Sequence, residues 1–139
     1  MTHRIFLAED DPDDIYLIKM AFQESQHNID LVSFEEGRAL MHRLNQLEAI
    51  ALPHLIMLDL NLPVFDGKAT LRSLKESSAL KAIPVVIYTT SKSERDIKDV
   101  YALGANSYMV KSPDYSELVS KIKTLCDYWF ETVQIGPMD

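Results

Sequence analysis

Five short apolar runs, each followed by a stretch with helical periodicity, constrain the fold of this chain more than any other feature of its sequence. Such runs fit strands that are buried on both faces, because a half-exposed strand would alternate apolar and polar residues. Strands and helices that alternate in this way predict a parallel sheet with helices on both faces. The predicted strands are Ile5–Ala8, Ile29–Phe34, Leu55–Leu58, Pro84–Tyr88 and Ser107–Val110.

Helix signals fill the segments between these runs. Asp11 and Pro12 suit the cap and the first position of a helix, and Gly104 suits the C-terminal stop of another. The sequence therefore predicts a flavodoxin-like α/β fold, with a doubly wound, five-stranded parallel sheet in the order 2-1-3-4-5 flanked by five helices. The expected helices begin at Pro12, after Gly37, at Lys68, near Ser93 and near Pro113, and the last runs into the 120s or as far as Glu131.

A formal charge of −7 over 139 residues bounds the partners of the protein. Such a charge opposes binding to DNA, RNA or anionic membranes, and no apolar run is long enough to span a bilayer. The single cysteine, Cys126, leaves no disulfide within the chain and favours a reducing compartment. We therefore expect a cytoplasmic protein with neither nucleic acid nor membrane as a partner.

Chemically active side chains stand where the predicted strands end. Glu9 and Asp10 follow the first strand, Asp59 follows the third, Thr89 the fourth and Lys111 the fifth. In a doubly wound sheet, ligands bind beyond the carboxyl ends of the strands, at the point where strand order reverses. Strands one and three are neighbours at that point. Glu9, Asp10 and Asp59 are therefore expected to share a pocket that Thr89 and Lys111 approach from the other side.

Three carboxylates in one pocket repel one another unless their pKa values rise or a cation neutralises them. Oxygen ligands without histidine or cysteine suit a hard divalent ion, and Mg²⁺ commonly shares its shell between carboxylates and a phosphate. Asp59 can then act as a nucleophile toward phosphorus, as carboxylates do in enzymes that form aspartyl phosphates. Lys111 and the Thr89 hydroxyl can stabilise the phosphoryl oxygens, since phosphoryl transfer needs positioning and positive charge more than acid–base catalysis.

Four motifs resemble those of the receiver domains of two-component response regulators, and the resemblance extends over roughly residues 3–125. We accordingly expect a receiver domain over residues 1–127, followed by a C-terminal helix extension and tail over residues 128–139. The motifs are Phe6-Leu7-Ala8-Glu9-Asp10-Asp11, Leu58-Asp59-Leu60-Asn61-Leu62-Pro63 with Asp66-Gly67, Val86-Ile87-Tyr88-Thr89 and Gly104-Ala105-Asn106-Ser107-Tyr108-Met109-Val110-Lys111.

The resemblance implies a role for each oxygen ligand of the pocket. Asp59 would be the phosphorylation site and a metal ligand, and Asp10 would bind Mg²⁺ directly. Glu9 would assist through water, and Asn61 would offer its backbone carbonyl. The phosphoryl donor would be a sensor histidine kinase or a histidine phosphotransfer protein. More loosely, the chain is similar to stand-alone receivers paired with phytochrome-type kinases.

Thr89 and Tyr108 match the switch pair of the family. The resemblance implies that the hydroxyl of Thr89 turns toward the phosphoryl group and that the ring of Tyr108 then moves inward, which changes the surface seen by partners. One departure concerns the fifth strand, where Ser112 separates Lys111 from Pro113, although the family usually has proline directly after the lysine. The backbone geometry next to Lys111 is therefore left open.

Three competing interpretations share parts of this pattern. Phosphatases of the haloacid-dehalogenase type carry a second acid two residues after the nucleophile, and here that position is Asn61. A flavin or dinucleotide carrier needs a phosphate-binding loop after the first strand, whereas Glu9 to Asp14 is strongly anionic. A degenerate receiver would lack one of the key groups, and none is missing. The sequence thus predicts a phosphoacceptor switch rather than an enzyme.

The end of the last helix is apolar over a wider arc than a core contact needs. Tyr128 and Phe130 fall on either side of a stripe that ends at Trp129. Extended packing against the domain and a homodimer or partner surface both remain open. The four histidines show no metal-ligand spacing and are expected to be surface or structural residues; they are His3, His27, His42 and His54.

Overall fold

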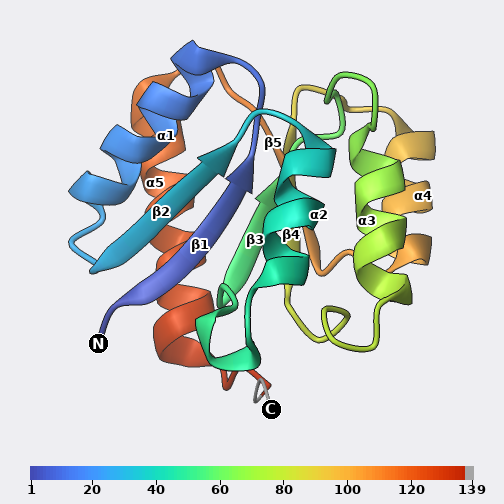
Figure 1. Ribbon diagram of the computed structural model, residues 1–139. Helices are drawn as coiled ribbons and strands as arrows, with labels where there is room; N and C mark the ends of the chain where they lie inside the picture. The colour runs from blue at the N-terminus through green and yellow to red at the C-terminus, as the bar shows by residue number, and fades with distance from the viewer. Residues whose placement is uncertain (137–139) are drawn as a thin grey trace.

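The predicted strands form one parallel sheet in the order β2-β1-β3-β4-β5, so the expected topology is confirmed (Figure 1). The computed structural model describes residues 1–136. The fourth strand begins one residue later than predicted, because Pro84 has no N–H to donate to the ladder. The strands are β1 (His3–Ala8), β2 (Ile29–Phe34), β3 (Leu55–Leu58), β4 (Val85–Thr89) and β5 (Ser107–Val110).

Five α-helices connect and cover these strands, and local capping explains where several of them begin and end. The Asp11 carboxylate accepts a hydrogen bond from the backbone N–H of Asp13, and Ser93 caps its helix in the same way. Gly104 ends that helix in the left-handed conformation, with φ of 109°. The helices are α1 (Pro12–Glu24), α2 (Gly37–Gln46), α3 (Gly67–Glu76), α4 (Glu94–Leu103) and α5 (Tyr115–Asp127).

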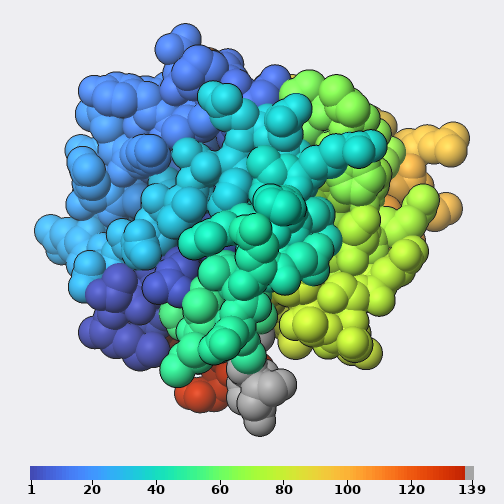
Figure 2. Space-filling view, viewed as in Figure 1, coloured from blue at the N-terminus to red at the C-terminus, as the bar shows by residue number. Residues whose placement is uncertain are grey.

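Alternate residues of the central strands face opposite helical layers. On β1, Ile5 and Leu7 pack with α1 and α5, whereas Phe6 and Ala8 pack with α2, α3 and α4. Figure 1 shows α2 in front of the sheet and α5 behind it, and in Figure 2 the teal side chains of α2 cover the middle of the front face. Burial on both faces explains why these strands are continuous apolar runs.

The C-terminal part of the chain differs in detail from the prediction. The last helix begins at Tyr115 rather than near Pro113, because the Asp114 carboxylate accepts a hydrogen bond from Ser116 N–H and so acts as its cap. A π-helical turn, Tyr128–Thr132, follows α5 directly. The proposed division into a receiver domain over 1–127 and an extension over 128–139 stays a prediction, and residues 137–139 of that extension lie outside the described residues.

Three further features complete the fold. A short 3₁₀ turn at Ala49–Ala51, which the sequence did not predict, leads into β3. All peptide bonds in residues 1–136 are trans, including the Ser112–Pro113 bond. Across the same residues, no helix combines the length and apolar character that a membrane crossing requires.

Candidate functional site

Three carboxylates meet at the carboxyl edge of β1 and β3, as predicted. The strand ladder extends one residue into the site, because Glu9 N–H donates to Phe34 O (2.9 Å) and Asp59 N–H donates to Ala8 O (3.0 Å). Glu9, Asp10 and Asp59 each offer an oxygen within 4.8 Å of the others. Glu9 and Asp59 are buried, whereas Asp10 is exposed. The pocket therefore has two buried carboxylates and one that faces solvent.

Lys111 is the cation at the centre of this pocket. Its Nζ lies 2.9 Å from Asp59 Oδ2, 2.8 Å from Asp14 Oδ2 and 2.6 Å from Glu9 Oε1. Burial tends to lower the pKa of the Lys111 ammonium, but the carboxylates of Asp14, Glu9 and Asp59 outweigh burial and hold the pKa above its ordinary value. Lys111 is therefore charged at every physiological pH.

Glu9 is the least satisfied group in the site. Burial raises the pKa of its carboxyl to about 7, and the charge of Asp59 adds to the rise, although Lys111 opposes it. Its Oε2 accepts from Asp11 N–H (3.2 Å). Among the described residues, its Oε1 is a buried oxygen that accepts no hydrogen bond of good angular geometry, despite its closeness to Lys111. An unsatisfied buried oxygen beside two further carboxylates fits a hard divalent cation, or a water bound to one.

The backbone holds Asp59 tightly from the side of the β3–α3 loop. Asn61 N–H donates to Asp59 Oδ1 (3.1 Å), and the Asn61 side chain is exposed. Gly67 N–H donates to Leu60 O, and a Cβ at Gly67 would lie only 2.3 Å from Asp59 O. Glycine is thus required at this close approach.

Thr89 and Tyr108 are brought together through Ser91. Thr89 is fully buried, and its Oγ1 accepts a long hydrogen bond from Ser91 N–H (3.4 Å), which uses a lone pair and not the hydroxyl proton. The Tyr108 hydroxyl donates to Ser91 O (2.9 Å). The Ser91 hydroxyl in turn donates to Asp96 Oδ2 (2.6 Å) on α4. A single loop residue therefore contacts both members of the expected switch pair.

Two participants were missed by sequence reasoning. Asp14 lies in the first turn of α1, at the end of the anionic stretch that begins at Glu9, and it contacts Lys111. Its position five residues after Glu9, on a helix that starts at the pocket, was the available signal. The bridging role of Ser91 had no signal in the sequence, because it depends on the side chains of α4 and β5.

Comparisons with known proteins match the whole fold. A family model described as the response regulator receiver domain matches residues 5–123. The curated response regulator Rcp1 of Synechocystis sp. is 37% identical over 134 residues, which cover 94% of this chain and 91% of Rcp1.

Two solved structures have a very similar backbone. The phosphorylated cyanobacterial phytochrome response regulator RcpA superimposes with a TM-score of 0.89 at 38% identity, over 97% of this chain and 99% of RcpA. The Mn²⁺-bound form of Rcp1 superimposes with a TM-score of 0.86 at 35% identity, over 96% of this chain and 99% of Rcp1.

Proposed function

The chain belongs to the response regulator receiver family, and on that premise we propose that Asp59 is the residue that accepts the phosphoryl group. The observation that carries the proposal is the position of Lys111, whose ammonium contacts Asp59, Glu9 and Asp14 together above a buried acid cluster. A nucleophilic carboxylate with a charged lysine 2.9 Å away is arranged to receive an anionic group.

The proposed reaction transfers phosphorus from nitrogen to oxygen. A carboxylate oxygen of Asp59 attacks the phosphorus of a phosphohistidine, the P–O bond forms as the P–N bond breaks, and the imidazole leaves with its electron pair and takes up a proton. The Lys111 ammonium stabilises the negative charge on one phosphoryl oxygen. The Thr89 hydroxyl donates a hydrogen bond to another phosphoryl oxygen. Asn61 N–H keeps Asp59 oriented, because it already donates to Oδ1.

The residues that would hold the metal are Asp10 and Asp59 directly, Glu9 through water and Asn61 through its backbone carbonyl. We propose Mg²⁺ as the ion, since all these ligands are oxygens and Mg²⁺ commonly completes its shell with water and phosphate oxygens. When bound, the ion supplies positive charge to the phosphoryl oxygens. The similar protein Rcp1 has been solved with Mn²⁺.

Receiver domains take their phosphoryl groups from histidine kinases or histidine phosphotransfer proteins. We propose a kinase of the phytochrome type as the source for this chain, because RcpA, at 38% identity, is a phytochrome response regulator. We also place the protein in the cytoplasm, where the buried free thiol of Cys126 would stay reduced.

The response proposed for phosphorylation starts at Thr89. When the Thr89 hydroxyl turns to a phosphoryl oxygen, its 3.4 Å hydrogen bond with Ser91 N–H is lost. The loop at Ser91 then keeps its hydrogen bond from Tyr108 but loses the restraint from Thr89. The ring of Tyr108 then moves inward and alters the face formed by α4, β5 and α5. A partner that prefers this altered face would read the phosphorylated state.

We also propose that the protein forms a homodimer through the end of α5. Trp129 and Phe130 are half-buried against the cluster between α1 and α5, whereas Tyr128 is 49% exposed beside the edge strand β5. Tyr128 is therefore the residue to test. Sedimentation of the Tyr128→Ala variant with and without phosphorylation should show a weakened dimer, and an unchanged monomer mass for the wild type under both conditions would end the idea.

The phosphoacceptor proposal is tested by intact-mass measurement. Wild type with Mg²⁺ and a small phosphodonor should gain one phosphoryl group, and chelation with EDTA should prevent the gain. Asp59→Asn should gain none. Asp66→Asn is the matched control, because it changes an exposed carboxylate in the same loop and keeps a side chain that can cap α3. Equal labelling of Asp59→Asn and wild type would refute the assignment.

The proposal also favours a switch over a phosphatase. A turnover phosphatase of the haloacid-dehalogenase type uses an acid two residues after the nucleophile, and Asn61 cannot transfer a proton in that role. Phosphate release by the wild type therefore tests the distinction. The wild type should release phosphate no faster than its phosphoryl group decays on Asp59, and sustained turnover of a phosphomonoester by the wild type would contradict a switch.

A further inference from the structure

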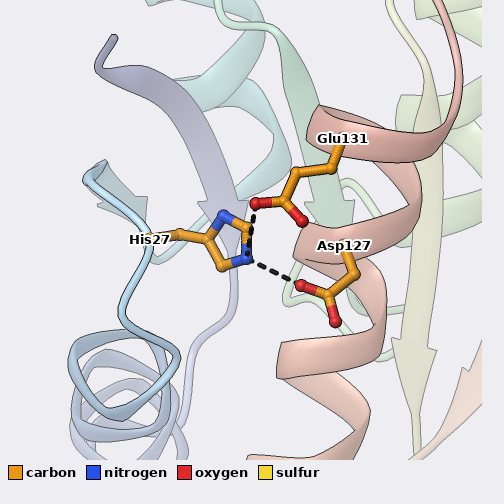
Figure 3. Close-up of side chains that lie close together, drawn as sticks. All are labelled: His27, Asp127 and Glu131. Carbon is orange, nitrogen blue, oxygen red and sulfur yellow. Dashed lines mark hydrogen bonds and ion pairs between the residues drawn. The ribbon is translucent and has the colours of Figure 1, made fainter.

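A second group of potential metal ligands lies at the opposite end of the sheet from Asp59. It consists of His27, in the turn between α1 and β2, and of Asp127 and Glu131 at the end of α5 (Figure 3). His27 Nε2 lies 2.9 Å from Asp127 Oδ1 and 3.9 Å from Glu131 Oε1. The three donor atoms lie within 4.8 Å of one another. Figure 3 shows both carboxylates directed at the same ring nitrogen.

The backbone is irregular in both of the segments that carry these three residues. Gln26, directly before His27, has a φ of 64°, a left-handed conformation that side chains other than glycine rarely adopt. Asp127 ends α5, and Glu131 sits inside the π-helical turn Tyr128–Thr132 that follows. Strained residues and single π-helical turns both concentrate at functional sites. Neither feature is needed for the receiver pocket, since both lie at the amino-terminal edge of the strands.

We propose that His27, Asp127 and Glu131 bind a divalent transition-metal ion of the zinc class. Metal–nitrogen and metal–oxygen bonds of about 2.1 Å put neighbouring donors of a tetrahedral site about 3.4 Å apart. The two distances from Nε2, 2.9 and 3.9 Å, lie on either side of that value, so small side-chain rotations would complete the geometry. One imidazole with two carboxylates suits borderline ions such as Zn²⁺ and Co²⁺ and distinguishes this site from the all-oxygen pocket.

The surrounding charges favour a cation. Lys123 Nζ lies 3.0 Å from Asp127 Oδ2, the oxygen that does not face His27, so the facing oxygen remains a ligand. Two carboxylates against one lysine leave a net negative charge when the imidazole is neutral. Cys126 is adjacent in sequence, but its buried side chain packs in the cluster between α1 and α5 and its sulfur is not one of the three grouped donor atoms. Glu131 is exposed, so solvent and ions can reach the three donor atoms.

The test is a titration with Zn²⁺, and with Co²⁺ for its visible spectrum, in saturating Mg²⁺ so that the oxygen-only pocket is occupied. Wild type should bind one Zn²⁺ per chain. His27→Gln and Glu131→Gln should each weaken binding by at least about tenfold, since loss of a ligand costs no less than loss of an outer-shell partner. Lys123→Gln should tighten binding severalfold, because it removes a competing positive charge.

His42→Gln is the matched control, because His42 is an exposed histidine on α2 whose ring contacts Gln46 and, within residues 1–136, no carboxylate. It should bind Zn²⁺ as wild type does, and so should Asp59→Asn. Equal affinity of wild type, His27→Gln and Glu131→Gln would overturn the proposal, and so would loss of the bound Zn²⁺ in Asp59→Asn. Glu131 is exposed, so its variant tests the site even if His27→Gln proves unstable.

Discussion

Two carboxylate clusters lie at opposite ends of the same sheet, and their surroundings shift carboxyl pKa values in opposite directions. At the carboxyl edge, Glu9 and Asp59 are buried against Lys111. At the amino-terminal edge, Asp127 and Glu131 surround His27 near the surface. Burial raises the pKa of Glu9 to about 7, whereas hydrogen bonds from His27 and Lys123 hold the pKa of Asp127 below its usual range.

The difference shows what burial does to an acidic group. A carboxylate in the buried pocket has few polar partners, so a proton, a lysine or a metal ion beside it lowers its free energy. The pocket therefore responds to changes in any of these three cations. At the surface, water and flexible partners already satisfy the charges, so their interaction is weak. The buried cluster should therefore control stability and phosphorylation, and the surface cluster should affect neither by much. Four experiments test this contrast.

The largest effect is expected from Lys111→Met, which leaves two buried carboxylates without their cation. The free energy of unfolding of the metal-free protein should fall by about 4 kcal/mol at pH 8, as for other broken buried ion pairs. The loss should shrink at pH 5, where Glu9 takes up a proton. Urea denaturation in EDTA measures both values. Lys98→Met, an exposed lysine on α4, is the control, and equal stability of the two variants would show that Lys111 is not needed.

Glu9→Gln should act in the other direction. The folded-state pKa of Glu9, about 7, lies above the unfolded value of 4.5, so its stabilising contribution is present below pH 4.5 and is lost as the pH rises through 7. The variant removes this loss and should be about 3 kcal/mol more stable than wild type at pH 8. Added Mg²⁺ should reduce this difference in stability between the variant and wild type, because it stabilises the wild type. A variant less stable than wild type at pH 8 would contradict the raised pKa, and Glu35→Gln, an exposed acid, is the control.

Asp14→Asn should have an intermediate effect. Asp14 is half-buried and is one of three carboxylates around Lys111, so two partners remain when it is neutralised. We expect a loss of about 1 kcal/mol in urea denaturation, with phosphorylation by a small phosphodonor retained. Asp13→Asn changes the neighbouring, exposed carboxylate and should cost less. If the two variants behave alike, the contact with Lys111 contributes nothing beyond the charge at the helix terminus.

The smallest effect belongs to His27→Gln in the absence of transition metals. The contact with Asp127 is partly exposed, so its removal should cost less than about 1 kcal/mol. Phosphorylation of Asp59 should be unchanged. Parallel thermal melts of this variant and His42→Gln provide the measurement. A cost comparable to that of Lys111→Met would mean that the surface cluster is a structural element of the fold, and the contrast between the two clusters would fail.

The sequence by itself determined the order of the strands and α-helices and four of the side chains at the carboxyl edge of the sheet. Glu9, Asp59, Thr89 and Lys111 each follow an apolar run, and the parallel arrangement brings the ends of those runs to one edge whatever the details of packing. The caps at Asp11, Ser93 and Gly104 can also be predicted from the sequence, because each depends only on residues within one turn.

Only the tertiary structure decided which side chains these groups meet. Asp14 contacts Lys111 across 97 positions of the chain, and His27 contacts Asp127 across 100. No local pattern encodes such pairs, because they depend on how α1 and the turn after it pack against β5 and α5. The four histidines had no ligand spacing in the sequence, and yet folding placed one of them between two acids. Spacing along the chain reports a site only when its ligands share an element or a sheet edge.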